Sequence, residues 1–328
     1  MIELDNNQLI FQFPEVHPKA VCRIDFQRTL RIPDDNRDYP LPPGLGRFPV
    51  AHVDDYADRL PEIWRRHGGV FIPMYQSEAL WINFSGRYPC AIKIAAGKIN
   101  AVSGETWQNA LSADPQDYVV IPEQPWLDGF NVSEDYIRQF VAMPLGEGFT
   151  AEEQITGQAE HGGLQIIAYP MKREVYIEYF GQPVSKERDA PLFSKGVYKP
   201  APDLGLAPGG LMRQEIYEDE YGIDAWNQEN GYRCFVHLTN SAVYQAITGR
   251  RPPHKPPTAK AYTDAGLPWF DYYSDDKALP GAGTLSKLTS VAAKAIEKGK
   301  SPLPDNDPVQ PKVVRNLGTA RVVRDGDF

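Results

Sequence analysis

The sequence is poor in cysteine and has no long hydrophobic run. Its 328 residues include three cysteines, Cys22, Cys90 and Cys234, which are widely spaced and odd in number. This pattern argues against a disulfide framework or a Cys-x-x-Cys metal site and favours a reducing compartment. The apolar runs are far shorter than the roughly 20 residues that cross a membrane, and the start lacks the pattern of a signal peptide. We therefore expect a soluble, cytoplasmic protein with no membrane partner.

Positive charge is also scarce. The 34 lysines and arginines are outnumbered by 43 aspartates and glutamates, which gives a net charge of -9. Nucleic-acid affinity depends on clustered basic residues, so a nucleic-acid partner is not expected. The sequence also lacks a phosphate-binding loop, a complete Gly-x-Gly-x-x-Gly fingerprint, His-Glu-x-x-His and Gly-x-Ser-x-Gly. We predict no cofactor and no metal.

Proline and glycine, in contrast, are abundant. The 30 prolines and 27 glycines divide the chain into short segments, which argues against long helices. Many of these segments are rich in β-branched and aromatic residues and are bounded by turn residues, as strands are. The pattern predicts a mostly β (α+β) fold, with an antiparallel β-sandwich or barrel-like body and few short helices. The predicted strands are 9–13, 21–26, 70–74, 79–84, 90–95, 99–102, 118–121, 137–143, 164–169, 175–180, 212–217 and 232–238.

Three segments have helical patterns. Residues 54–67 place apolar side chains on one face, but Pro61 predicts two short helices in place of one. Asn240 and Gly249 predict the start and the end of a helix over 241–248. Residues from Thr284 to Gly299 predict a late amphipathic helix capped by Thr284.

We expect residues 1–299 to form a single compact β-rich unit. A soft domain boundary is suggested near 183–210, where Pro, Lys, Asp and Gly accumulate without periodicity. Residues 300–328 are predicted to be a proline-rich linker and a C-terminal tail. The tail could pair with a sheet edge of its own chain or of another subunit, and the second alternative predicts a homo-oligomer.

The first candidate site is the loop after the predicted strand 118–121. A sugar site needs a flat apolar ring and nearby polar groups for the hydroxyls. Here Trp126 and Gln124 are candidate ligand-binding residues, and Glu123 and Asp128 are candidate catalytic carboxylates. The alternative is that Trp126 closes the end of the core and that the polar side chains make turn hydrogen bonds.

The second candidate site combines Glu152 and Glu153 with Glu160 and His161. A histidine with carboxylates in reach could act as a general base, or the group could hold a cation, so Glu153 and His161 are further catalytic candidates. The alternative is a solvated helix turn in which Thr150 and Glu153 form a capping box.

Two further segments could bind partners. Residues 268–273 are rich in aromatic residues, and Trp269 is a candidate anchor of an interface or a core residue under a long loop. Residues 250–257 have an Arg-x-x-Pro-x-x-Pro spacing, which could bind an aromatic groove or serve as a rigid connector.

These features lead to a hypothesis and two alternatives. The leading hypothesis is a non-catalytic binding or assembly protein that presents aromatic-rich loops to a protein or carbohydrate partner. One alternative is a glycosidase-like hydrolase with paired carboxylates near Trp126. The other is a lectin-like sugar binder that uses the Trp126 loop without catalysis. The sequence leaves open whether the protein is an enzyme.

Overall fold

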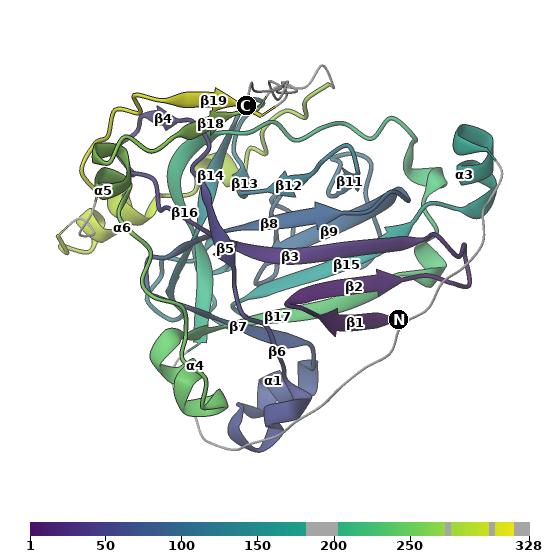
Figure 1. Cartoon of the computed structure of the whole chain (residues 1–328), viewed down its shortest axis with the longest axis horizontal. Coiled ribbons are helices and arrows are strands. Elements are labelled where there is room, and N and C mark those ends of the chain that lie inside the picture. Colours follow the sequence, from purple (N-terminus) through teal and green to yellow (C-terminus); the bar gives the residue numbers. More distant parts are fainter. Residues whose placement is uncertain (182–202, 273–276, 302–305, 318–328) are drawn as a thin grey trace, which may run out of the picture.

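Antiparallel strands make up most of the structure, a computed structural model that describes residues 1–181, 203–272, 277–301 and 306–317. The predicted mostly β fold is confirmed. The longer strands are arranged in two layers, with the purple strands β2 and β3 in front of β15 and β17 (Figure 1). The helices are short and lie at the periphery.

The first layer contains the N-terminal strands. Antiparallel pairings connect its members in spatial order, from an edge strand at the N-terminus to the strand that carries Trp126. The order is β1 (Ile2–Asp5), β2 (Gln8–Gln12), β3 (Val21–Thr29), β8 (Ala79–Ser85) and β12 (Trp126–Leu127).

The second layer contains strands from the middle of the chain. Its pairings are antiparallel except for the last, which is parallel. The order is β11 (Val119–Ile121), β9 (Cys90–Ala96), β15 (Leu164–Pro170), β17 (Tyr232–Asn240) and β7 (Val70–Met74).

Two strands connect the layers at one side. β14 (Tyr136–Pro144) pairs with β8 and with β16 (Asp203–Arg213), and β16 pairs in turn with β17. The barrel is not closed. Short strands complete the pairing: β4 (Asp38–Tyr39), β5 (Gly44–Arg47), β6 (Ala51–His52), β10 (Ile99–Asn100), β13 (Gly129–Asn131), β18 (Trp269–Asp271) and β19 (Val314–Asn316).

The period-two pattern of the strands separates an inner face from an outer face. In β17, Cys234, Val236 and Leu238 belong to the main core cluster, which contains side chains of both layers. Phe235 and His237 alternate with them and stack on rings of α1 (Glu62–His67). Since successive side chains of a strand point to opposite faces, this arrangement separates Cys234 from His237.

The first two helical predictions are confirmed. The segment 54–67 forms two short helices, η1 (Asp54–Arg59) and α1, with Pro61 at the N-cap of the second. Residues 241–248 form α4 (Ser241–Thr248), where the Asn240 side chain accepts a hydrogen bond from the Ala242 N–H and Gly249 is left-handed. Tyr244 of α4 packs against β7 in a second, smaller core.

Three predictions need correction. The predicted strand 212–217 is a strand only at its start, because β16 ends at Arg213 and the Tyr217 N–H donates to the Gln124 side chain. Residues 175–180, expected as a strand, belong to helix α3 (Arg173–Phe180). In a helix, Tyr176 and Phe180 lie on the same side, and their ring centroids are 5.2 Å apart. Tyr176 also stacks on Tyr88. This tertiary packing overrides the β-type composition of the segment.

The late helix is also shorter than predicted. It is divided into η4 (Leu285–Lys287) and α6 (Val291–Glu297) because Leu288 is extended, and the cap is Ser290, not Thr284. The remaining helices are α2 (Ala151–Thr156), α5 (Ala259–Asp264), η2 (Ile223–Ala225) and η3 (Gln228–Asn230).

The suggested domain boundary at 183–210 is largely outside the described residues. Its described end belongs to β16, which pairs with β14, β17 and β4. The described part of the C-terminal tail, 306–317, contacts the body of its own chain. Asn306 exchanges two hydrogen bonds with the backbone of Asp34, and β19 pairs in parallel with β18.

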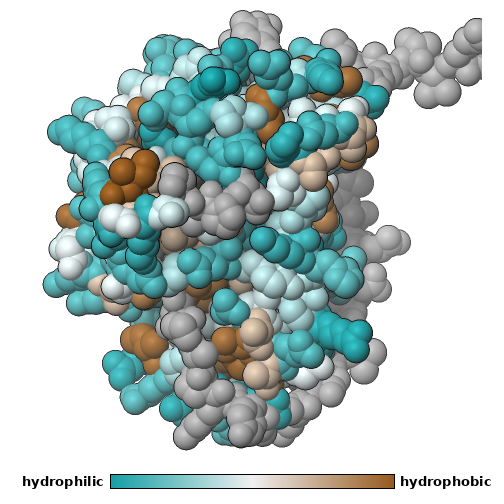
Figure 2. All heavy atoms as spheres, turned by 90° about the vertical axis from the view of Figure 1, so that its left-hand side faces the viewer, coloured by the Kyte–Doolittle hydropathy of each residue, from teal (hydrophilic) through white to brown (hydrophobic). Residues whose placement is uncertain are grey.

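No helix in the described ranges is long and apolar enough to cross a membrane. On the face that carries α5 and α6, hydrophobic side chains form small separate spots within a mainly hydrophilic surface (Figure 2).

Candidate functional site

A shallow, open pocket lies over the loop that contains Trp126. The loop follows β11, and Trp126 begins β12, where it pairs with Asn83 of β8. The pocket lining combines aromatic rings with amide and charged side chains, among them Trp126, Tyr272, Gln124, Gln214, Arg213 and Tyr217. Its composition is that of a polar site with flat apolar walls.

The aromatic rings around Trp126 form an edge-to-face group. Tyr272 lies 4.8 Å from Trp126 between ring centroids, at an interplanar angle of 68°. Trp81 of β8 lies 6.4 Å away between ring centroids, at 74°. Trp126 is only partly buried, so one region of its surface is accessible at the pocket.

The two glutamines beneath the pocket position the loop. Gln124 is buried, donates to the carbonyl oxygens of Trp126 and Glu215, and accepts from the Tyr217 N–H. Gln214 donates to the Trp126 carbonyl and accepts from the Asp128 N–H. The structure therefore places Gln124 at the pocket wall with its polar atoms engaged inside the protein.

The two candidate carboxylates of this loop, Glu123 and Asp128, are directed into the protein and not into the pocket. Glu123 accepts a hydrogen bond from the Tyr221 hydroxyl at 2.7 Å, and its Oε2 has no partner in the described part of the chain. Asp128 is 4% exposed, and burial raises its pKa to about 7 although a side-chain hydrogen bond with Trp126 lowers it. Neither Glu123 nor Asp128 lines the pocket.

Trp269 does not line this pocket. It is fully buried, its indole N–H donates to Thr263 at 3.1 Å, and its ring packs near Tyr39 and Tyr262. The structure thus places Trp269 in the core, where it joins β18 to the body. Its ring is not accessible to a ligand.

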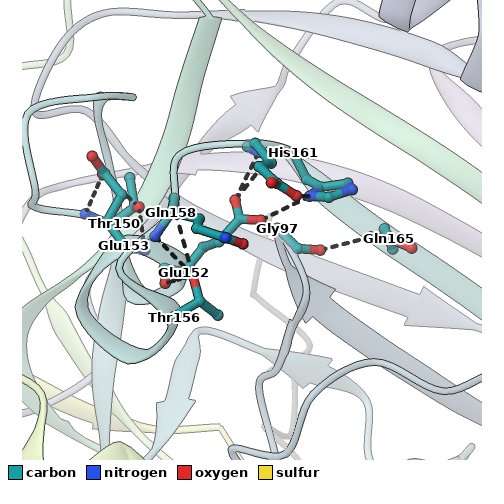
Figure 3. Close-up of polar contacts among 10 residues, drawn as sticks. Gly97, Thr150, Glu152, Glu153, Thr156, Gln158, His161 and Gln165 are labelled. Atoms are coloured by element: carbon teal, nitrogen blue, oxygen red, sulfur yellow. Dashed lines mark hydrogen bonds and ion pairs between the residues drawn. The ribbon is translucent and has the colours of Figure 1, made fainter.

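The second candidate cluster forms around Glu152 of α2 (Figure 3). Glu152 Oε1 lies 2.9 Å from Nδ1 of His161, and Oε2 accepts from the backbone N–H groups of His161 and Gly162. Glu160 is exposed and lies 3.8 Å from the same ring nitrogen. The structure therefore brings His161 together with two carboxylates, as the sequence suggested. Such a carboxylate orients an imidazole and fixes its tautomer.

Glu153 has a different position. Its carboxylate accepts from the backbone N–H and the hydroxyl of Thr150, and its own N–H donates to the Thr150 hydroxyl. This is the reciprocal capping box of α2. Glu153 therefore serves the helix start and is turned away from His161, as Figure 3 also shows.

Sequence reasoning missed two histidines of this region. The ring of His67 is nearly parallel to those of His161 and His237, at 6.1 and 6.2 Å. His237 stacks on Trp64 at 4.4 Å, and burial lowers its pKa to about 4 although a hydrogen bond with the Gly68 carbonyl raises it. The alternation of a strand places Phe235 and His237 on the same face of β17, which the sequence can predict. No sequence pattern predicts that His67, His161 and His237 lie close together.

Within the described residues, no group of three or more histidine, cysteine, aspartate or glutamate side chains has the geometry to hold a metal ion. The chain matches no protein-family model, no curated protein and no solved structure.

Proposed function

We propose that the chain is a non-catalytic binding protein whose Trp126 pocket binds carbohydrate. The observation that carries the proposal is the partly exposed ring of Trp126, which makes edge-to-face contacts with Trp81 and Tyr272 at a shallow polar pocket. The face of a sugar ring stacks on such an aromatic surface, and the polar rim is suited to its hydroxyls.

The loop is also rigid in a way that favours binding. The carbonyl of Trp126 accepts from both Gln124 and Gln214, so the backbone next to the indole is fixed from two sides. A ring that is held in place before the ligand arrives loses little conformational freedom on binding.

The environment of the carboxylates favours binding over hydrolysis. Glycoside hydrolysis needs two carboxyl groups that flank the scissile bond. Glu123 is bonded to Tyr221, Asp128 is buried, and neither lines the pocket.

A glycosidase-like hydrolase remains the second candidate because of Asp128. A general acid at neutral pH requires a raised carboxyl pKa, and burial raises the pKa of Asp128 to about 7. Release of reducing sugar from the bound glycan, lost in Asp128→Asn, would favour this candidate over simple binding.

A glycan array probed with the full chain, followed by calorimetry on the best ligand, tests the proposal. Trp126→Ala should weaken binding at least tenfold, as loss of a central aromatic contact does. Tyr179→Ala provides the control, because it removes an exposed aromatic ring outside the pocket and should leave the affinity unchanged. Absence of any glycan ligand, or equal affinity of Trp126→Ala, would contradict the proposal.

A further inference from the structure

A second open pocket lies where the proline segment 250–257 passes from α4 to α5 along the side of the body (Figure 1). Its walls come from three stretches that are far apart in the sequence: Arg31, the β7–β8 turn 75–78, and residues 255–258. It shares no lining residue with the Trp126 pocket. The two pockets are therefore separate sites.

The charged side chains at this second pocket leave a net positive charge. Arg31 and Lys255 supply two cations, and Glu78 is the one carboxylate among the described lining residues. Both oxygens of Glu78 are engaged, since Oε1 lies 2.7 Å from Nη2 of the buried Arg28 and Oε2 accepts from the Tyr75 N–H at 2.9 Å. The charge of Arg28 balances that of Glu78, so Arg31 and Lys255 set the charge of the pocket. In a chain with a net charge of -9, such a local surface is suited to an anion.

Neutral hydrogen-bond donors lie in the same lining. They are the hydroxyls of Ser77 and Thr258 and the side-chain amide of Gln76. The Ser77 hydroxyl contacts only the weakly accepting sulfur of Met143, at 3.8 Å, and the Thr258 hydroxyl accepts from the Ala261 N–H, which leaves its hydrogen to donate. A guanidinium fork, an ammonium group and several hydroxyls match the three terminal oxygens of a phosphate group better than the two oxygens of a carboxylate.

The rest of the lining is apolar. It consists of the ring of Tyr75 and the rings of Pro256 and Pro257. A pocket that combines a few polar groups with flat apolar walls suits a small organic molecule. The composition therefore favours a phosphate group that carries an organic substituent.

The backbone at Arg31 is fixed from both sides by one buried side chain. Gln139 is fully buried, its Oε1 accepts from the Ile32 N–H, and its Nε2 donates to the Leu30 carbonyl. Leu30 and Ile32 are themselves buried in the core, while Arg31 between them is partly exposed at the pocket. The origin of this cation is therefore set by the fold.

The opposite wall is fixed as well. Arg28 donates to the His254 carbonyl, and the Tyr75 hydroxyl donates to the Pro253 carbonyl, directly before Lys255. The prolines that follow have restricted backbone angles. Walls that are in place before a ligand arrives reduce the entropy cost of binding.

We propose that this pocket binds the phosphate group of a small phosphomonoester. Arg31 and Lys255 contact the phosphate oxygens, and the organic group lies against Tyr75 and the two prolines. Arginine contributes a planar fork of donors and lysine a point charge, a combination that suits phosphate. This site is independent of the proposed carbohydrate site.

Calorimetric titration of the full chain with phenyl phosphate at constant ionic strength tests the site. The titration is made at pH 8 alone, where a phosphomonoester is a dianion. We expect saturable binding of one ligand per chain. Inorganic phosphate in a parallel titration should bind about threefold more weakly or worse, because it lacks the group that contacts the apolar wall.

Charge-removing variants identify the residues that bind. Arg31→Gln should weaken the binding of phenyl phosphate about tenfold, through loss of charged hydrogen bonds. Lys255→Gln should weaken it about threefold, because Lys255 is exposed and its charge is screened. Arg87→Gln changes an exposed arginine outside the pocket and should leave the affinity unchanged.

Four outcomes would overturn the proposal. The first is heat that never saturates, and the second is unchanged affinity in both Arg31→Gln and Lys255→Gln. Near-ultraviolet circular dichroism checks that the variants are folded, and if Arg31→Gln is not, the exposed Lys255→Gln decides. The third is competition by acetate as effective as that by inorganic phosphate, which would show recognition of charge alone. The fourth is equal affinity for phenyl phosphate and inorganic phosphate, which would contradict the contact of the organic group with Tyr75 and the prolines.

Discussion

Arg28 and Glu78 form a buried ion pair, with 2.7 Å between Nη2 and Oε1. Arg28 also donates to the backbone carbonyl of His254, and the Tyr75 hydroxyl donates to the backbone carbonyl of Pro253. The proline segment 250–257 is thus bound to the body at two consecutive carbonyls. This contact supports its interpretation as a connector between α4 and α5.

The ion pair predicts a large effect of removing one partner. Glu78→Ala leaves the Arg28 charge buried without a counter-ion, and we expect a loss of about 3–5 kcal/mol in the free energy of unfolding. The exposed pair Glu62 and Arg66 provides a control, since Glu62→Ala should cost less than about 1 kcal/mol. Urea denaturation of both variants measures the difference, and equal losses would contradict this account.

Asp128 predicts a pH dependence. Its pKa of about 7 in the folded state lies above the ordinary value, so the folded state binds the proton more tightly and this group's contribution to stability falls as the pH rises from about 4 to 7. Asp128→Asn removes this loss. The stability of the variant relative to wild type should therefore increase by roughly 2–4 kcal/mol between pH 4 and pH 8. A difference that does not change with pH, measured by urea denaturation, would refute the prediction.

His237 predicts the opposite slope. Its pKa of about 4 lies below the ordinary value of 6.5, so the unfolded state takes up a proton first when the pH falls from about 6.5 to 4, and stability is lost over that window. His237→Gln should remove about 3 kcal/mol of this acid-dependent loss. Unfolding curves at pH 4.5 and pH 7 for both proteins provide the measurement, and an unchanged acid loss in the variant would rule out His237 as its source.

The C-terminal tail predicts a result in solution. The described tail pairs with β18 of its own chain and buries Val309, so we expect deletion of residues 300–328 to lower stability and to leave the oligomeric state, measured by light scattering, unchanged. A smaller assembly after the deletion would show that the tail holds subunits together.

Much of the local structure follows from the sequence. Asn240 and Gly249 delimit α4 because a side-chain acceptor and a left-handed residue satisfy helix ends. The Gly97-Lys98 turn joins β9 and β10 for a similar local reason. The predictions for the start of α6 and for α3 were wrong. Leu288 is extended and Tyr176 stacks on Tyr88, and neither feature can be predicted from the local sequence.

The candidate sites could be predicted only in part. Glu152 and His161 are close in sequence, so their pairing was within reach of pattern analysis. His67 comes to His161 through the packing of α1 on β17, which has no sequence signal. The orientation of Glu123 toward Tyr221 likewise depends on a contact between residues 98 positions apart.

The indole N–H resonances during titration with the best array glycan test the proposed carbohydrate site most directly. The account predicts a saturable shift of the Trp126 resonance, while that of the fully buried Trp269 remains constant. A glycan that binds and shifts other tryptophans but leaves Trp126 unchanged would contradict it.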